Sequence, residues 1–251
     1  MIQKEWDAAL NTLPPFELPK NFLEKWQGRK AEAEKTRIIE EKPFLSGNEK
    51  MAVYSEISFT GTDGETLKAR YIRPVGEGKS PLVLFFHAES IPMRGWHYMT
   101  RFIALGYAVF ALENRKNVPF EQQVQDAFCA AQIGFHLPHT DEKQVFALGD
   151  SLGGTLAIAV SAFFPIAKCI TQNPLAGGDY TACVGFASLL NQPFLMATSG
   201  MDEVSTPETQ VPVYAVVPAH KKHFLYPKFI HERINHFEDQ MIVFLHPATM
   251  I

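Results

Sequence analysis

The chain has 251 residues, of which 46% are hydrophobic and 20% are charged, and its formal net charge at pH 7 is −4. This length can bury a full core and fits one large α/β domain better than two. The acidic balance excludes an extended basic surface for nucleic acid, so we expect a small-molecule partner instead.

The first seven residues are too polar for a signal peptide, and no apolar run approaches the length of a membrane span. The three cysteines are odd in number and show no Cys-x-x-Cys spacing for zinc or redox chemistry, so we interpret them as reduced packing residues: Cys129, Cys169 and Cys183. We therefore predict a cytoplasmic protein that needs no metal or cofactor and has no membrane partner.

Residues 1–42 are predicted to form a helical arm that packs on a domain made of residues 43–251. A charged helical pattern runs from Asn21 to about Lys35, after prolines at positions 14, 15 and 19. Large apolar residues at helical spacing usually face a core, so we expect three aromatic residues to anchor this arm: Trp6, Phe22 and Trp26.

The next segments predict a hairpin followed by alternating strands and helices. Residues 53–60 and 66–73 alternate in polarity around the turn signal at 61–64, which indicates two antiparallel strands. The apolar run 82–86 is typical of a strand buried on both faces, and we expect it near the centre of the sheet. Helices are predicted at 95–105 and 120–135, with strands at 107–112 and 144–148. This alternation indicates a mostly parallel sheet that binds its ligand beyond the carboxyl ends of the strands.

The strand at 144–148 runs directly into Gly149-Asp150-Ser151-Leu152-Gly153, and an apolar helix follows at 155–164. A serine nucleophile must stand clear of its own backbone on such a strand-to-helix turn, and small flanking residues let the turn close. Ser151 is therefore the candidate nucleophile. The alternatives are a chance pentapeptide in a tight turn and a phosphate-binding glycine loop, although no Gly-Lys-Ser/Thr follows.

Beyond this helix we predict a strand at 167–171, an irregular connection at 173–191 and a strand at 194–198 that ends at Asp202. A helix interrupted by prolines at 212 and 218 is predicted from 207 to about 219. The last strand is expected at 223–226 and the last helix at 235–245.

A serine nucleophile needs a histidine base held by a carboxylate, and the α/β-hydrolase arrangement places them in the order serine, acid, histidine. Asp202 is the first acidic residue beyond a strand end, so it is the candidate acid; Glu203, Glu208 and Asp179 are weaker choices. Asp202 could instead cap the helix near Pro207. His231 follows the last strand and is the candidate base, with His236 as its rival.

Taken in this order, the chain resembles the acetyl xylan esterase and cephalosporin-C deacetylase group, carbohydrate esterase family seven. The matching segments are Phe22 to Trp26, Phe85-Phe86-His87, Arg94 to His97, Leu105 to Ala111, Gly149 to Gly154, Gly200-Met201-Asp202 with Pro207, and Tyr226 to Glu232. The resemblance implies an α/β-hydrolase fold and a triad of Ser151, Asp202 and His231. It also implies that the backbone N–H groups of Leu152 and Glu89 hold the oxyanion.

The chain departs from the family in three places. Arg115-Lys116-Asn117 replaces the Arg-Gly-Gln motif, and only 51 residues separate Ser151 from Asp202 (202 − 151), which implies a shortened cap and a more open pocket. Glu89 would bring a carboxylate close to the oxyanion unless it turns away or pairs with Arg94. The shortened cap also leaves open whether the chain forms a homo-oligomer like the family's hexamer.

We predict a metal-independent serine esterase that removes acetyl or other small acyl groups from a carbohydrate or similar alcohol. Its partner would be a small-molecule acyl ester, such as an acetylated sugar. Two other hypotheses stay open at this point: a serine peptidase-like hydrolase, and a non-catalytic binding protein with the α/β-hydrolase fold.

Overall fold

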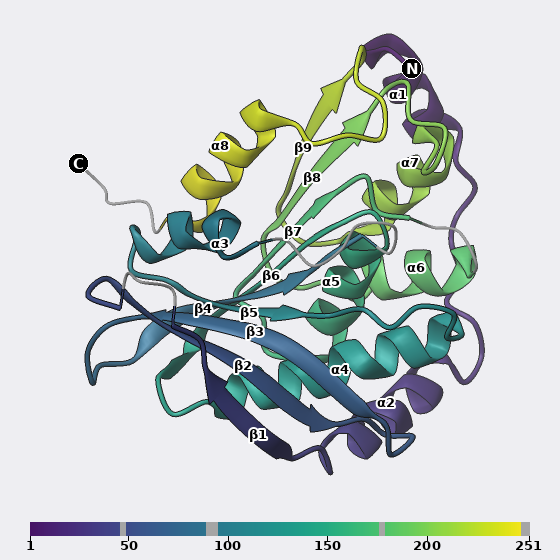
Figure 1. Cartoon of the computed structure of the whole chain (residues 1–251). Coiled ribbons are helices and arrows are strands. Elements are labelled where there is room, and N and C mark those ends of the chain that lie inside the picture. The colour runs from purple at the N-terminus through teal and green to yellow at the C-terminus, as the bar shows by residue number, and fades with distance from the viewer. Residues whose placement is uncertain (46–48, 89–94, 176–178, 247–251) are drawn as a thin grey trace.

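The computed structural model describes residues 1–45, 49–88, 95–175 and 179–246. In that part of the chain, nine strands form one sheet in the order β1-β2-β3-β5-β4-β6-β7-β8-β9 (Figure 1). The strands are β1 (Ile38–Pro43), β2 (Ala52–Thr60), β3 (Thr66–Pro74), β4 (Ser80–Phe86), β5 (Ala108–Leu112), β6 (Thr140–Asp150), β7 (Lys168–Gln172), β8 (Phe194–Ser199) and β9 (Lys221–Tyr226).

The sheet is antiparallel at its N-terminal edge and parallel in the rest. Strands β2 and β3 form the predicted hairpin, with Ala52 opposite Pro74 and Thr60 opposite Thr66. From β5 onward all neighbouring pairs are parallel. Strand β4 lies in the middle of the order, and its residues 82–86 are all buried, as their continuous apolar run predicted.

Strand β1 is a feature that the sequence analysis did not predict. It pairs antiparallel with β2 at the edge of the sheet. Its residues, 38–43, include residue 42, where we predicted that the helical arm ends. All six of its residues are exposed, and its sequence, Ile-Ile-Glu-Glu-Lys-Pro, does not alternate in polarity. An edge strand with no buried face lacks the period-two pattern by which strands are predicted.

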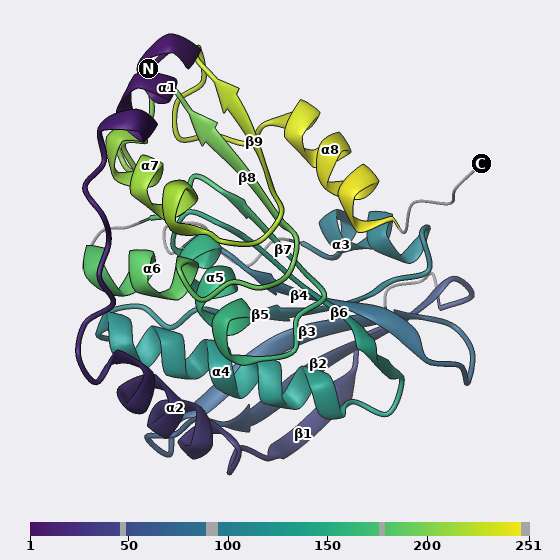
Figure 2. The ribbon, with the colours of Figure 1, turned by 180° about the vertical axis from the view of Figure 1, so that it is seen from behind.

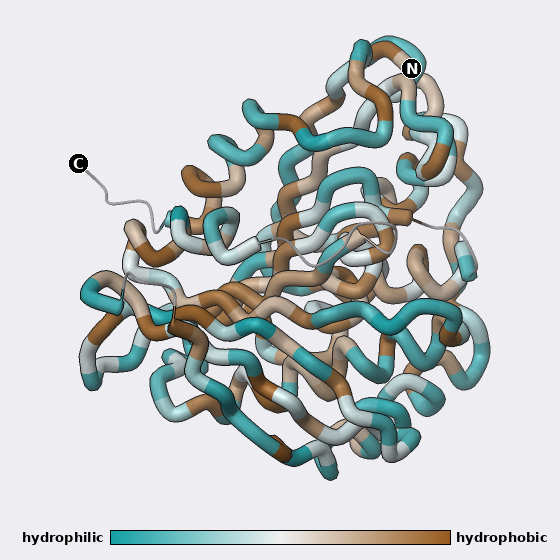
Figure 3. The backbone as a smooth tube through the Cα atoms, in the orientation of Figure 1, coloured by the Kyte–Doolittle hydropathy of each residue, from teal (hydrophilic) through white to brown (hydrophobic). Residues whose placement is uncertain are grey.

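Helices cover both faces of the sheet (Figures 1 and 2). One face carries α4 (Phe120–His136), α5 (Leu152–Phe163) and α7 (Pro207–Val216), and outside them lie α1 (Gln3–Thr12), α2 (Phe22–Ala33) and α6 (Tyr180–Ala187). The other face carries α3 (Trp96–Ile103) and α8 (Asn235–Leu245). Two separate hydrophobic clusters fill these layers. Figure 3 shows the hydrophobic residues concentrated along the central strands. The fold class is therefore that of the α/β hydrolases, as expected.

Helix α6 corrects one prediction, because it lies within the segment 173–191 that we expected to be irregular. Asp179 caps it by accepting a hydrogen bond from the backbone N–H of Ala182 at 2.8 Å. Six of its eight residues are buried, so the helix is apolar on nearly every side and shows no amphipathic period. Helix α7 ends at Val216, three residues earlier than predicted, and contains Pro212.

The N-terminal helices pack through their aromatic residues. Trp6 and Trp26 are each 1% exposed. The indole of Trp6 stacks on the His223 ring with 4.0 Å between centroids, and Trp26 meets Phe186 at 4.8 Å. The arm thus contacts both α6 and β9. Among the described residues, no helix is long and apolar enough to cross a membrane.

Candidate active site

Ser151 occupies a sharp turn between β6 and α5. Its backbone angles are φ 55° and ψ −124°, a conformation that side-chain-bearing residues rarely adopt and that costs roughly 1–3 kcal/mol. Its N–H donates to the Gln172 carbonyl at 2.9 Å, and its own carbonyl accepts from the Leu175 N–H at 3.0 Å. The chain after β7 therefore holds the strained turn from both sides.

Two glycines make this turn possible. A Cβ on Gly149 would lie 2.0 Å from the Gly153 carbonyl oxygen, and a Cβ on Gly153 would lie 2.1 Å from the Phe86 carbonyl oxygen. Both clashes are with backbone, so no side-chain rotation relieves them. The glycines flanking Ser151 are thus required by the close approach of α5 to β6 and β4, as the motif predicted.

Asp202 lies in the loop after β8 and its side chain is fully buried. One carboxylate oxygen, Oδ1, accepts hydrogen bonds from the backbone N–H groups of Val204 and Ser205, both at 2.8 Å. These bonds fold the loop around the carboxylate. The helix that follows begins with Thr206 as its N-cap, so Asp202 does not occupy the capping position considered from the sequence.

His231 lies in the loop between β9 and α8, and its ring reaches the other oxygen of this carboxylate. The distance from His231 Nδ1 to Asp202 Oδ2 is 2.7 Å. Because an ionised carboxylate only accepts hydrogen bonds, Nδ1 carries the proton and Nε2 is left as an acceptor. That is the tautomer a base needs in order to take a proton from a serine.

Ser151 and His231 line one small pocket of about 100 Å³ at the carboxyl ends of the parallel strands. The other lining residues mostly carry amide or charged side chains: Ala88, Asp150, Gln172, Asn173, Glu232 and Arg233. Arg233 is paired with Glu238, its Nε donating to Oε1 at 2.6 Å. Burial raises the pKa of Glu238, but Arg233 and Arg101 outweigh it and the net pKa lies below the usual value.

The oxyanion donors are only partly within the described structure. Leu152 is buried and is the first residue of α5, where the N–H groups have no partner inside the helix. Glu89, the second predicted donor, and Arg94, its predicted partner, lie outside the described residues. His87 precedes them at the end of β4, and its carbonyl accepts from Asn114 Nδ2 at 2.5 Å.

The rival candidates are placed elsewhere. His236 lies on α8 with its Nδ1 2.8 Å from the hydroxyl of Tyr226 on β9, and Asp179 caps α6. Glu203 and Glu208 are exposed. Of the acids and histidines considered, the structure joins Asp202 to His231 and places His231 in the pocket of Ser151.

Arg115, at the altered family motif, lies outside this pocket and has a structural contact. It donates from Nε and Nη2 to the two oxygens of Asp126, both at 2.7 Å, and from Nη1 to Asp63 at 2.8 Å. Burial raises the pKa of Asp126 despite these bonds. Burial also acts to raise the pKa of Asp63, but its hydrogen bonds, above all the one from Arg115, outweigh burial and the net pKa is lowered. The arginine therefore ties the β2–β3 turn to α4.

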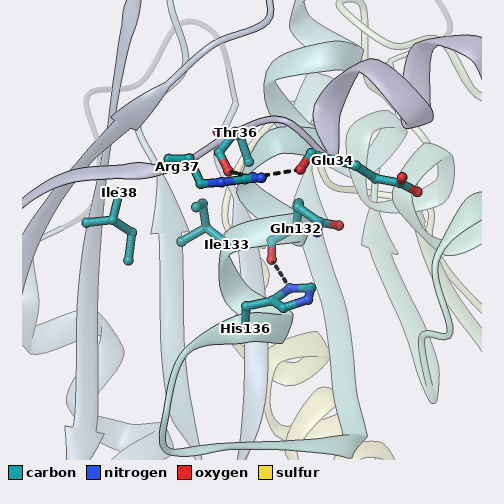
Figure 4. Close-up of a pocket in the computed structure, with 7 residues that line it drawn as sticks. All are labelled: Glu34, Thr36, Arg37, Ile38, Gln132, Ile133 and His136. Atoms are coloured by element: carbon teal, nitrogen blue, oxygen red, sulfur yellow. Dashed lines mark hydrogen bonds between the residues drawn. The ribbon is translucent and has the colours of Figure 1, made fainter.

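A larger pocket of about 410 Å³ lies between the end of α2, the start of β1 and α4 (Figure 4). It shares no lining residue with the pocket of Ser151. Arg37 donates to the carbonyls of Glu34 and Thr36, and His136 Nδ1 is bonded to the Gln132 carbonyl. These polar groups of Arg37 and His136 therefore form hydrogen bonds to backbone carbonyls of the protein itself. In the described part of the chain, no group of three or more acidic, histidine or cysteine side chains could hold a metal ion.

Gln172 and Asn173 also line the pocket and were not predicted from the sequence. They belong to no catalytic motif, and we assigned Asn173 only to an irregular connection. A usable signal was their position directly after a short parallel strand, because ligand sites in such sheets form at the carboxyl ends of the strands.

The chain matches one protein family and is similar to several solved structures. The model of the Acetyl xylan esterase (AXE1) family matches residues 10–118, 111–176 and 171–247. Acetyl xylan esterase 1 from Thermoanaerobacterium sp. JW/SL YS485 is similar in structure, with a TM-score of 0.85, 22% identity and coverage of 98% of both chains. An acetyl xylan esterase from Paenibacillus sp. R4 has a TM-score of 0.86 at 16% identity, over 98% of this chain and 99% of that one.

A more distant similarity is to a putative dipeptidyl aminopeptidase IV from Bacteroides ovatus ATCC 8483. It has a TM-score of 0.69 and 15% identity, and the match covers 80% of this chain but 36% of that one. No curated protein sequence matches the chain. At these identities the solved structures establish the fold alone, whereas the family match spans almost the whole chain.

Proposed function

The chain belongs to the acetyl xylan esterase family and is an ester hydrolase, and from this premise we propose that it removes acetyl groups by a serine acyl-enzyme mechanism. Ser151 is the nucleophile, His231 the general base and Asp202 the acid that orients it. The alcohol is a carbohydrate or a similar polyol.

One observation carries this proposal. The His231–Asp202 hydrogen bond of 2.7 Å lies beside the pocket that His231 shares with Ser151. Two loops 29 residues apart in the chain supply the pair, and a strained turn supplies the serine. Such strain persists only where the surrounding structure enforces it, and it is typical of functional sites.

In the first half of the reaction, His231 Nε2 accepts the Ser151 hydroxyl proton as Oγ attacks the acetyl carbonyl carbon. The carbonyl π electrons move to oxygen, and the N–H of Leu152 stabilises the negative charge that forms there. Asp202 stabilises the imidazolium. The tetrahedral intermediate then collapses, and the imidazolium gives its proton to the departing sugar alkoxide, which leaves as an alcohol.

In the second half, water takes the place of the alcohol. His231 removes a proton from this water, the hydroxide attacks the acetyl-Ser151 carbonyl, and a second tetrahedral intermediate forms. Its collapse returns the proton to Ser151 Oγ and releases acetic acid, which ionises to acetate at neutral pH. We expect Glu89 to supply a second oxyanion donor, as predicted from the sequence.

The pocket supports a small acyl group and a polar alcohol. Its volume of about 100 Å³ suits an acetyl group better than a long acyl chain, and the carboxylates of Asp150 and Glu232 in its lining can accept hydrogen bonds from hydroxyl groups. Peptidase-like activity would require the same catalytic residues to cleave an aminoacyl amide. A binding protein of this fold would require no turnover.

The test is hydrolysis of nitrophenyl acetate and nitrophenyl butyrate by the wild type and by Ser151→Ala, with fluorophosphonate labelling in parallel. We expect acetate to be the better substrate and both turnover and labelling to be lost in the variant. Ser161→Ala is the matched control, since it makes the same change at a buried serine of α5. An active Ser151→Ala protein would refute the nucleophile. Labelling with turnover of an aminoacyl anilide instead would favour the peptidase, and neither labelling nor turnover would favour the binding protein.

The proposal also includes a cytoplasmic location. It is supported by three free, buried cysteines, whose thiol pKa values burial raises to about 12. Cell fractionation would test the location. A homo-oligomer stays a prediction, which light scattering would test.

A further inference from the structure

Residues 172–175 comprise the last residue of β7 and the three that follow it, and β7 lies between the strand that leads to Ser151 and the strand that leads to Asp202. In the sheet, Gln172 is paired with Asp150 of β6 on one side and with Ala197 of β8 on the other. This segment therefore lies next to both the nucleophile turn and the acid loop.

The segment holds the acid loop through two contacts. The Asn173 side chain donates from Nδ2 to Ser199 Oγ at 3.0 Å and accepts from the Ser199 N–H at 2.7 Å. The Ser205 hydroxyl donates to the Pro174 carbonyl at 2.7 Å, and Ser205 also donates its N–H to Asp202. Together with the two backbone bonds to Ser151, these contacts fix nucleophile and acid to the same four residues.

The base loop joins this segment through the Gln172 side chain. Its Nε2 donates to the Glu232 carbonyl at 2.8 Å, and Glu232 is the residue directly after His231. The His231–Asp202 bond fixes the Nδ1 side of the imidazole, and the Met201 N–H donates to the Phe229 carbonyl at 2.9 Å on the N-terminal side of His231. The Gln172 amide holds the peptide group on the other side of His231.

We propose that Gln172 is a positioning residue, whose backbone carbonyl holds the Ser151 peptide while its side-chain amide holds the His231 loop. One residue thus bonds directly to both the nucleophile turn and the base loop. This inference rests on the proposed function, because it assigns Gln172 a role only if Ser151 and His231 react together.

The expected effect follows from the geometry that proton transfer requires. A base must lie within about 2.6–3.2 Å of the proton-bearing atom, and a misplacement of about 1 Å can lower a rate roughly a hundredfold. Loss of the Gln172 amide leaves the Ser151–Gln172 backbone bond unchanged and releases only the base loop. The chemical step should therefore slow while substrate binding is retained.

The experiment compares Gln172→Met with the wild type, using nitrophenyl acetate kinetics, the rate of fluorophosphonate labelling and the melting temperature. Gln192→Met is the matched control: Gln192 is also half-buried, and its Nε2 donates to the backbone carbonyl of Ser161 at 2.9 Å. Gln172→Asn is the second variant, since it keeps the amide but is one methylene shorter.

We expect Gln172→Met to lower kcat at least tenfold with KM within about twofold of the wild type, and to slow labelling by a similar factor. Its melting temperature should fall no further than that of Gln192→Met. A kcat no lower than that of the control would overturn the inference. A rise in KM with unchanged kcat would also overturn it, because Gln172 would then contact the substrate. If Ser151→Ala is inactive while Gln172→Met is fully active, only this inference fails and the proposed function stands.

Discussion

The exchange of Asp202 for asparagine offers a direct test of the proposed triad, because it changes one acceptor of a fully buried carboxylate into a donor. Oδ1 accepts from the N–H groups of Val204 and Ser205, and Oδ2 accepts from His231 Nδ1. Asparagine has one acceptor and one donor in place of two acceptors. The asparagine can therefore adopt one of two orientations, with its carbonyl oxygen either at the two backbone N–H groups or at His231.

With its carbonyl oxygen in the position of Oδ1, the introduced amide would keep both backbone bonds and turn its NH₂ group towards His231. The imidazole would then present the Nδ1 lone pair and carry its proton on Nε2, so it could not accept the proton of Ser151. The opposite orientation would place the NH₂ group against two backbone donors. Each unmet buried donor costs about 1–3 kcal/mol, so the inactive tautomer is favoured.

We expect Asp202→Asn to lower kcat for nitrophenyl acetate about 10⁴-fold, the loss typical of a triad that is held in the wrong tautomer. The fold should persist, because both backbone hydrogen bonds remain and the bond to His231 is only reversed in direction. Asp179→Asn is the control: asparagine is as good an N-cap as aspartate, so α6 and the activity should be unchanged. A folded Asp202→Asn protein that keeps a tenth of the activity would refute the reasoning, as would an equal loss in Asp179→Asn.

Three further predictions concern the turn and the core. Gly153→Ala should abolish activity and lower the free energy of unfolding by about 1–3 kcal/mol or more, because its Cβ would lie 2.1 Å from a backbone oxygen of β4. Urea melts measure this loss. Gly28→Ala is the control: the added Cβ meets nothing within 4 Å, so this variant should stabilise α2 in the same melts. Burial lowers the pKa of His223 to about 3, so the unfolded chain takes up a proton below about pH 6.5 that the folded protein does not bind. The free energy of unfolding should therefore fall as the pH drops from 6.5 towards 3, by up to about 1.4 kcal/mol per pH unit. Urea melts of His223→Phe should show a flatter dependence on pH. An equal slope in the variant would show that His223 is not responsible. Arg115→Met removes the ion-pair partner of Asp126, whose side chain is 4% exposed. It should lower the free energy of unfolding by about 3–5 kcal/mol and leave kcat unchanged. A change below about 1 kcal/mol would show that the fold does not need the ion pair.

The strands that are buried on both faces were predictable because burial on both faces requires a continuous run of apolar residues. Residues 82–86 and 145–148 are runs of buried apolar side chains, and their strands have partners on both sides. The Ser151 turn was predictable for a related reason, since the close approach of backbone at Gly149 and Gly153 restricts the residue type at those positions. Strand β1 and helix α6 left no such trace. The first has no buried face and the second has hardly an exposed one, so neither shows a periodic pattern.

The sequence by itself determined the α/β class, the order along the chain of the strands after β1, and the three residues proposed for the triad. It could do so because each of these depends on local composition or on chain order. The tertiary structure alone decided which groups meet. The roles of Gln172 and Asn173 arise because β7 is placed between β6 and β8, and the pairing of strands far apart in sequence follows from packing of the whole sheet. Contacts of this kind carry no motif, since any side chain with a donor at the right distance would serve.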